Sequence, residues 1–166
     1  MRNWKPATAG LAALAAVTLA AGTAYAASDH AFIRKAMQGD NSETRLGTIA
    51  AERGASPEVR DFGRMLARDH AAAKQDAVRV ARALGVAPTS NMTPEARAEE
   101  RRLARLSGRD FDHEFARYMV ENHRKDIEDF QKQARSGGAL TRRLADQTLP
   151  VLRHHLQEAR DLSRST

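Results

Sequence analysis

The chain has 166 residues, of which 27 are Lys or Arg and 21 are Asp or Glu, and it has no cysteine. This length fits one domain. The lack of cysteine excludes disulfide scaffolds, cysteine nucleophiles, a lipoprotein anchor, and zinc or iron–sulfur centres held by cysteine. With 10 Gly and 5 Pro the chain is too poor in turn residues for a many-stranded β protein. Its mean hydropathy of −0.59 excludes a polytopic membrane protein.

Residues 1–26 have the order of a secretory signal peptide. A basic start precedes an uncharged run at 7–22, and a small-x-small site at 24–26 predicts cleavage after Ala26. The uncharged run of about 16 residues is short for a membrane-spanning helix, which needs roughly 20. A retained anchor is the alternative. We therefore expect an exported protein, periplasmic or associated with the outer membrane, with its mature domain at 27–166.

Apolar residues spaced three or four apart predict four long helices in the mature domain. They cover residues 28–53, 56–84, 109–136 and 140–162. The second begins at a strong start signal, a serine cap followed by proline and an acidic residue in the first turn. Pro150 lies inside the fourth helix, where we expect a local kink because proline removes one backbone hydrogen bond.

A long connection separates the second and third predicted helices. It covers about residues 86–109 and contains a short, arginine-rich helix from Thr93 to about Leu106. Two helical hairpins joined by a connection that can cross the length of the bundle are typical of ferritin-like folds. The sequence therefore predicts an all-α, ferritin-like four-helix bundle with a short extra helix.

Ionisable side chains of metal-binding types interrupt the apolar stripe of every long helix. In chain order they are Glu43, Asp69, His70, His123, Asp126, His155 and Glu158. On each helix they lie about 12 to 17 residues from a predicted hairpin turn, roughly 18 to 26 Å, so we expect them near the middle of the bundle. Burying such groups is costly unless pairing, water or a metal offsets the cost.

Two interpretations of these residues stay open. Imidazole and carboxylate together suit a divalent transition metal such as iron, zinc or copper, or the cluster binds another small ligand. Di-iron bundles use Glu-x-x-His pairs, whereas this chain has the reversed pairs His123-x-x-Asp126 and His155-x-x-Glu158, which disfavours a ferroxidase centre. In the alternative, the same groups bond to one another and only fix helix packing. Acid would then weaken the bundle by protonating Asp69 and Glu43.

The rest of the chain offers weaker signals. No catalytic nucleophile and no glycine-rich phosphate loop is present, so an enzyme is the least favoured class. The arginines at 101–109 alternate with the glutamates at 95–100, which indicates a solvated face rather than a nucleic-acid-binding surface. We expect no nucleic-acid partner, and an envelope protein or an anionic membrane surface as the partner instead.

Motifs on all four long helices resemble a bacterial family called domain of unknown function 4142. They are Phe32-x-x-x-Ala36 with Glu43-x-x-Leu46-Gly47-x-x-Ala50, Ser56-Pro57-Glu58-Val59-x-x-Phe62 with Met65-x-x-x-Asp69-His70, Phe111-Asp112 with His123, and Leu149-Pro150-x-Leu152-x-His154-His155-Leu156. The resemblance spans about residues 28–163. It implies an exported, ferritin-like four-helix bundle, often labelled an outer-membrane protein, and implies no activity.

The family's recurring Glu, Asp-His, His and His positions correspond to Glu43, Asp69, His70, His123 and His155 of this sequence. Gly63 stands where the family more often has alanine, which predicts slightly looser packing at that point. Two functions remain as hypotheses: an exported bundle that binds a metal or small ligand, with a link to stress, and a non-enzymatic structural or interaction module of the cell envelope.

Overall fold

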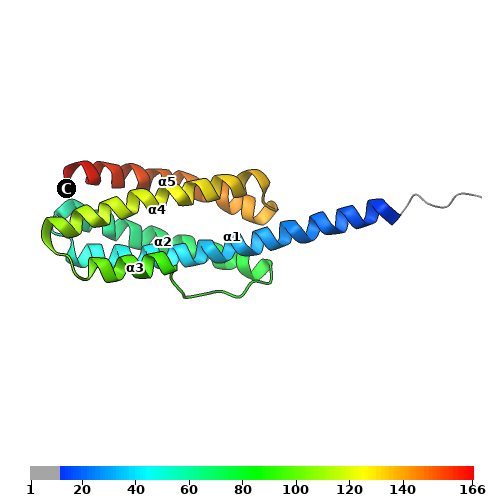
Figure 1. The fold of residues 1–166 in the computed structure, drawn as a ribbon, viewed down its shortest axis with the longest axis horizontal. Helices are drawn as coiled ribbons and strands as arrows, with labels where there is room; N and C mark the ends of the chain where they lie inside the picture. Colours follow the sequence, from blue (N-terminus) through cyan, green and yellow to red (C-terminus); the bar gives the residue numbers. More distant parts are fainter. Residues whose placement is uncertain (1–11) are drawn as a thin grey trace, which may run out of the picture.

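A computed structural model describes the backbone of residues 12–166 and the side chains from Ala26 onward. This part of the chain forms five helices and no strand: α1 (Ala12–Arg53), α2 (Pro57–Ala83), α3 (Pro94–Leu103), α4 (Gly108–Ser136) and α5 (Ala139–Ser165). The four long helices lie side by side as a bundle, and the first part of α1 projects beyond it (Figure 1). The predicted all-α class is confirmed.

The α1–α2 turn and the beginning of α4 lie at the same end of the bundle. The backbone N–H groups of Ala55 and Ser56, in the turn, each donate to the carboxylate of Asp112 on α4 at 2.8 Å. The end of α2 is at the opposite end, so the segment 84–107, with α3 in it, runs back along the bundle (Figure 1).

A second buried carboxylate joins the other end of the bundle. Asp29 on α1 accepts hydrogen bonds from Gln133 on α4, from Thr141 on α5 and from the backbone N–H of Gly138 in the turn between them. The Asp29 contact therefore ties α1 to the α4–α5 hairpin, while the Asp112 contact ties the α1–α2 hairpin to α4.

The buried apolar side chains form two clusters at different heights. The larger lies toward the α1–α2 turn and includes Leu46, Phe62, Leu66, Phe115 and Met119. The smaller lies toward the α4–α5 turn and consists of Ile33, Met37, Ala77, Ala81, Val86 and Leu144. On α1, α2 and α5, the polar residues Glu43, His70 and His155 lie between the two clusters along the chain.

The start of the first predicted helix differs from the structure. The first helix does not begin at Ser28: α1 is continuous from Ala12 through Ser28, because this alanine-rich stretch contains no proline to stop it. The basic start of the predicted signal peptide lies outside the described residues. None of the described helices has a stretch long and apolar enough to cross a membrane. Pro150 lies inside α5, as the sequence predicts, and the local kink expected there stays a prediction.

Gly63 is a point of close helix contact, so the expectation of looser packing there was wrong. A Cβ atom on Gly63 would lie 2.6 Å from the carbonyl oxygen of Gly47 and 2.6 Å from the backbone nitrogen of Ala51, both on α1. These are backbone atoms and cannot rotate away. The absence of a side chain on both Gly47 and Gly63 lets α1 and α2 approach each other here.

We expect Gly63→Ala to lower the free energy of unfolding by about 1–3 kcal/mol, because the added methyl group forces the two helices apart. Gly39→Ala is the matched control, since a Cβ there meets no side chain or neighbouring helix of the described structure within 4 Å. The control should gain about 0.5–1 kcal/mol from the better helix propensity of alanine. Urea unfolding followed by circular dichroism measures both, and equal stability of the two variants would contradict the close contact.

Candidate metal centre

Three histidines from three helices face one another in the middle of the bundle. His70 on α2, His123 on α4 and His155 on α5 are buried, and one ring nitrogen of each lies within 4.8 Å of the others. Their ring centroids form a nearly equilateral triangle with sides of 5.8, 5.3 and 5.4 Å. The three rings thus surround one common point.

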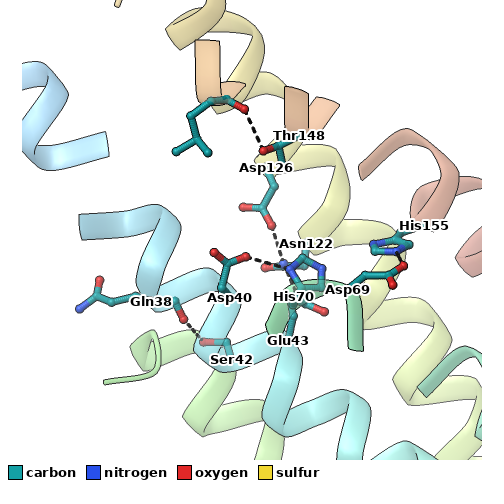
Figure 2. Close-up of polar contacts among 11 residues, drawn as sticks. Gln38, Asp40, Ser42, Glu43, Asp69, His70, Asn122, Asp126, Thr148 and His155 are labelled. Carbon is teal, nitrogen blue, oxygen red and sulfur yellow. Dashed lines mark hydrogen bonds and ion pairs between the residues drawn. The ribbon is translucent and has the colours of Figure 1, made fainter. Parts of the chain in front are cut away.

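Each histidine is held by one hydrogen bond on the side away from that point. Nδ1 of His70 lies 3.0 Å from Oδ1 of Asp40, and Nε2 of His155 lies 3.1 Å from Oδ2 of Asp69. Nδ1 of His123 lies 3.0 Å from the carbonyl oxygen of Met119, one turn earlier on α4. Figure 2 shows the two carboxylate contacts. Because carboxylate and carbonyl oxygens only accept, the bonded nitrogens carry the protons.

The other ring nitrogen of each histidine has no such bond. Nε2 of His70, Nε2 of His123 and Nδ1 of His155 are buried without a hydrogen-bond partner in the described part of the chain. Buried polar atoms in folded proteins nearly always have a partner. Three unpaired imidazole nitrogens close together have the donor chemistry that could hold a metal ion once His70 is neutral.

A carboxylate from α1 lies beside the histidines. Glu43 is 1% exposed, and its Oε1 accepts a hydrogen bond of 2.8 Å from the side-chain amide of Asn122. Its second oxygen, Oε2, is buried and has no partner among the described residues. The same amide of Asn122 donates to Asp126 at 2.9 Å, so Asn122 bridges the two carboxylates (Figure 2).

Burial sets the protonation states of this centre. It lowers the pKa of His155 to about 4 and holds the pKa of His123 well below its usual range, so both rings are neutral at pH 7. Burial also raises the pKa of Glu43 to about 7 and that of Asp126 to about 6. At His70 the effect of burial is outweighed by Asp40 and Glu43, which raise its pKa.

The structure brings most of the predicted site residues together, in different roles. His70, His123 and His155 form the centre, Glu43 lies beside it, and Asp69 supports His155 from behind. Asp126 contacts Asn122 and is not part of the histidine triangle. Glu158 is not part of the histidine triangle either. It lines a separate surface pocket together with His154, Phe62 and Met65.

Sequence reasoning missed Asp40 and Asn122. Asp40 is four residues after Ala36 and three before Glu43, so the same helical spacing that identified Glu43 also places Asp40 on the inner face. It was overlooked because the stripe was traced through Phe32, whereas the fully buried residues of this helix begin with Ile33 and Met37. Asn122 directly precedes His123, and no pattern in the sequence marks it.

The fold and the centre together define an all-α helical bundle with a buried three-histidine cluster. A sequence model of the family described as "Domain of unknown function (DUF4142)" matches residues 14–162. The chain therefore belongs to this family, and the resemblance inferred from the motifs is confirmed. No curated protein and no solved structure matches the chain.

The sign of the acid effect at Glu43 is opposite to the one expected from the sequence. Its pKa is about 7 in the folded state against 4.5 for the ordinary group, so the folded protein loses stability as pH rises through this range. Protonation of Glu43 in acid therefore stabilises the bundle. The Asp69 carboxylate has a lowered pKa, because hydrogen bonds from His155 and Arg68 outweigh its burial, and follows the expected direction.

In metal-free protein we expect Glu43→Gln to be more stable than the wild type at pH 8, by up to ~3 kcal/mol, and of similar stability at pH 4.5. Glutamine retains an oxygen that accepts from Asn122 but carries no charge. Urea unfolding in the presence of a chelator at the two pH values measures this difference. A stability difference that does not change with pH would mean that Glu43 is not buried as a charged group.

Proposed function

We propose that the chain binds one divalent transition-metal ion through His70, His123 and His155. The observation that carries this proposal is the three inward, unpaired ring nitrogens around one point. Tetrahedral zinc bonded to three imidazoles holds their nitrogens about 3.4 Å apart, so small side-chain rotations bring these atoms to binding distance. Glu43 is outside the set of three whose ligand atoms lie within 4.8 Å of one another, so we assign its unpaired Oε2 the role of accepting a hydrogen bond from a metal-bound water.

The composition of the centre favours a mononuclear site. Three imidazoles with one carboxylate suit zinc, copper, iron or nickel, whereas two-iron centres need several carboxylates to bridge the ions. The Asp40–His70 and Asp69–His155 contacts add the outer carboxylates that orient metal-binding histidines in many proteins. We retain iron, zinc and copper as the metals to test first.

The alternative function is a structural or interaction module of the cell envelope whose polar centre only fixes helix packing. The unpaired atoms count against it, because a network selected for packing alone would bond its own members. We further propose a ferritin-like relationship for the bundle, on the long connection between its hairpins, and export, on the order of residues 1–26. An envelope protein or anionic membrane surface as partner, and a link to stress, remain predictions.

We expect the protein, purified without chelator and without a nickel column, to bind about one equivalent of Co²⁺ or Zn²⁺. Binding to the folded state alone should raise its stability by about 2.7 kcal/mol at a free metal concentration 100 times Kd. Replacing His123 by alanine should abolish binding, and His154→Ala, an exposed neighbour of His155, is the matched control. Elemental analysis and thermal unfolding with and without metal are the measurements.

Two results would support the structural alternative instead. One is a wild-type protein that takes up less than about a tenth of an equivalent and whose melting temperature does not respond to metal. The other is a His123→Ala variant that is destabilised without metal yet binds as much metal as the His154→Ala control.

The Asp40–His70 contact gives a finer test of the same proposal. Asp40→Asn preserves volume and an oxygen that accepts from Nδ1 of His70, but removes the negative charge that makes the imidazole a better ligand. We expect a 10- to 100-fold rise in the Kd for Zn²⁺, the usual effect of losing an outer carboxylate. Competition with a chromophoric chelator measures it, and an unchanged Kd would mean that His70 is not a ligand.

A further inference from the structure

Two hollows meet on the α1–α4 side of the bundle. The inner cavity, so named because buried His70 and Asp40 are among its lining residues, has a volume of about 20 Å³, room for one water. The outer groove, of about 760 Å³, opens to solvent between α1, α3 and α4. Three residues line both hollows: Lys35, Gly39 and Asp126. These three mark the boundary between solvent and the histidine centre.

Gly39 leaves a gap at this boundary. It lies in the interior of α1, where glycine costs about 0.5–1 kcal/mol relative to alanine. Unlike Gly47 and Gly63, it is not required by a close helix contact, because a Cβ on Gly39 has no side chain or neighbouring helix of the described structure within 4 Å. Its absence of a side chain therefore serves no packing purpose, and it preserves open space between the outer groove and the inner cavity.

The groups around the gap suit a cation. Asp126 lines both hollows, and Asn122 connects its carboxylate to that of Glu43 inside. Lys35 at the mouth is ion-paired with Asp129, and the two side chains are 60% and 42% exposed. An exposed pair of this kind is worth little, so it opens readily and leaves a second carboxylate free.

The inner end of the path is an unsatisfied ligand. His70 is 5% exposed and is the one histidine of the centre that lines the inner cavity, together with Asp126. Its Nε2 is buried and has no partner among the residues that the structure describes. Asp126 and the ring of His70 therefore border the same space.

We propose that divalent metal ions reach the three-histidine centre through the gap at Gly39, with Asp126 as the carboxylate that first receives them. This inference rests on the proposed metal-binding function. It assigns to Gly39 and Asp126 a role in the rate of loading, in contrast to the histidines, which determine whether the metal binds at all.

The test is stopped-flow uptake of Co²⁺, whose visible absorption reports its coordination, by the full chain. Gly39→Leu fills the gap, and Ala31→Leu, at an exposed position of the same helix, is the matched control. We expect Gly39→Leu to slow uptake by at least about tenfold, equivalent to about 1.4 kcal/mol of barrier. Its Kd should equal that of the control, so release to a chelator should slow by the same factor. Asp126→Asn should slow uptake by about tenfold through loss of electrostatic attraction.

The outcomes separate this inference from the function on which it rests. If the wild type takes up no Co²⁺, both fail. If the wild type and Gly39→Leu load at the same rate with the same Kd, the path is wrong and the metal centre stands. A Gly39→Leu variant whose Kd rises while its uptake rate is unchanged would show a distorted centre rather than a blocked path, and would also overturn the inference. Unfolding curves of both leucine variants without metal confirm that each is folded.

Discussion

The structure depends on a layer of polar groups buried halfway along the bundle. Three histidines and the Glu43 carboxylate occupy positions that apolar side chains fill elsewhere on the same helices. Each histidine is fixed by one hydrogen bond from behind, which chooses its tautomer and leaves one nitrogen facing inward. The layer is therefore ordered by the protein but incomplete within it. Its outer nitrogens are bonded and its inner nitrogens are not, and this difference is the basis of the proposed metal site.

The first helix supplies the acidic half of the centre, and its position is determined by contact with α2. The close approach at Gly47 and Gly63 fixes the register of α1 along α2. That register places Asp40 beside His70, and the next turn of α1 places Glu43 beside Asn122. Small changes at the glycine contact are thus transmitted to His70 and Glu43, because a closely packed interior transmits strain.

Much of this arrangement could be predicted from the sequence because helices have a fixed rise and period. The spacing of Glu43, His70, His123 and His155 within their stripes placed all four on inner faces, and their distances from the turns placed them at one height. The all-α class and the family followed from the same pattern and motifs. Spacing alone does not determine which carboxylate contacts which imidazole, and so Asp126 and Glu158 could not be separated from Asp69.

Other features depended on information that one sequence does not carry. The role of Asn122 arises from the rotation of α4 relative to α1, which is set by contacts far from it along the chain. Gly39 and Gly63 are the same residue type in different surroundings. A Cβ on Gly39 would meet open space, whereas a Cβ on Gly63 would meet the backbone of α1. The start of α1 was placed too late because a serine is a good cap only where the preceding residues leave the helix, and here they continue it.

The polar layer also lies between the two apolar clusters of the interior, which share no residue. The cluster toward the α4–α5 turn is the smaller, with Ile33, Met37 and Leu144 among its members. Regions with fewer buried apolar contacts open at lower free energy, so we expect the end with the smaller cluster to open before the other. The hydrogen bonds of Asp29 join α1 to the α4–α5 hairpin at this end. We therefore expect amide exchange to be faster there than around the larger cluster.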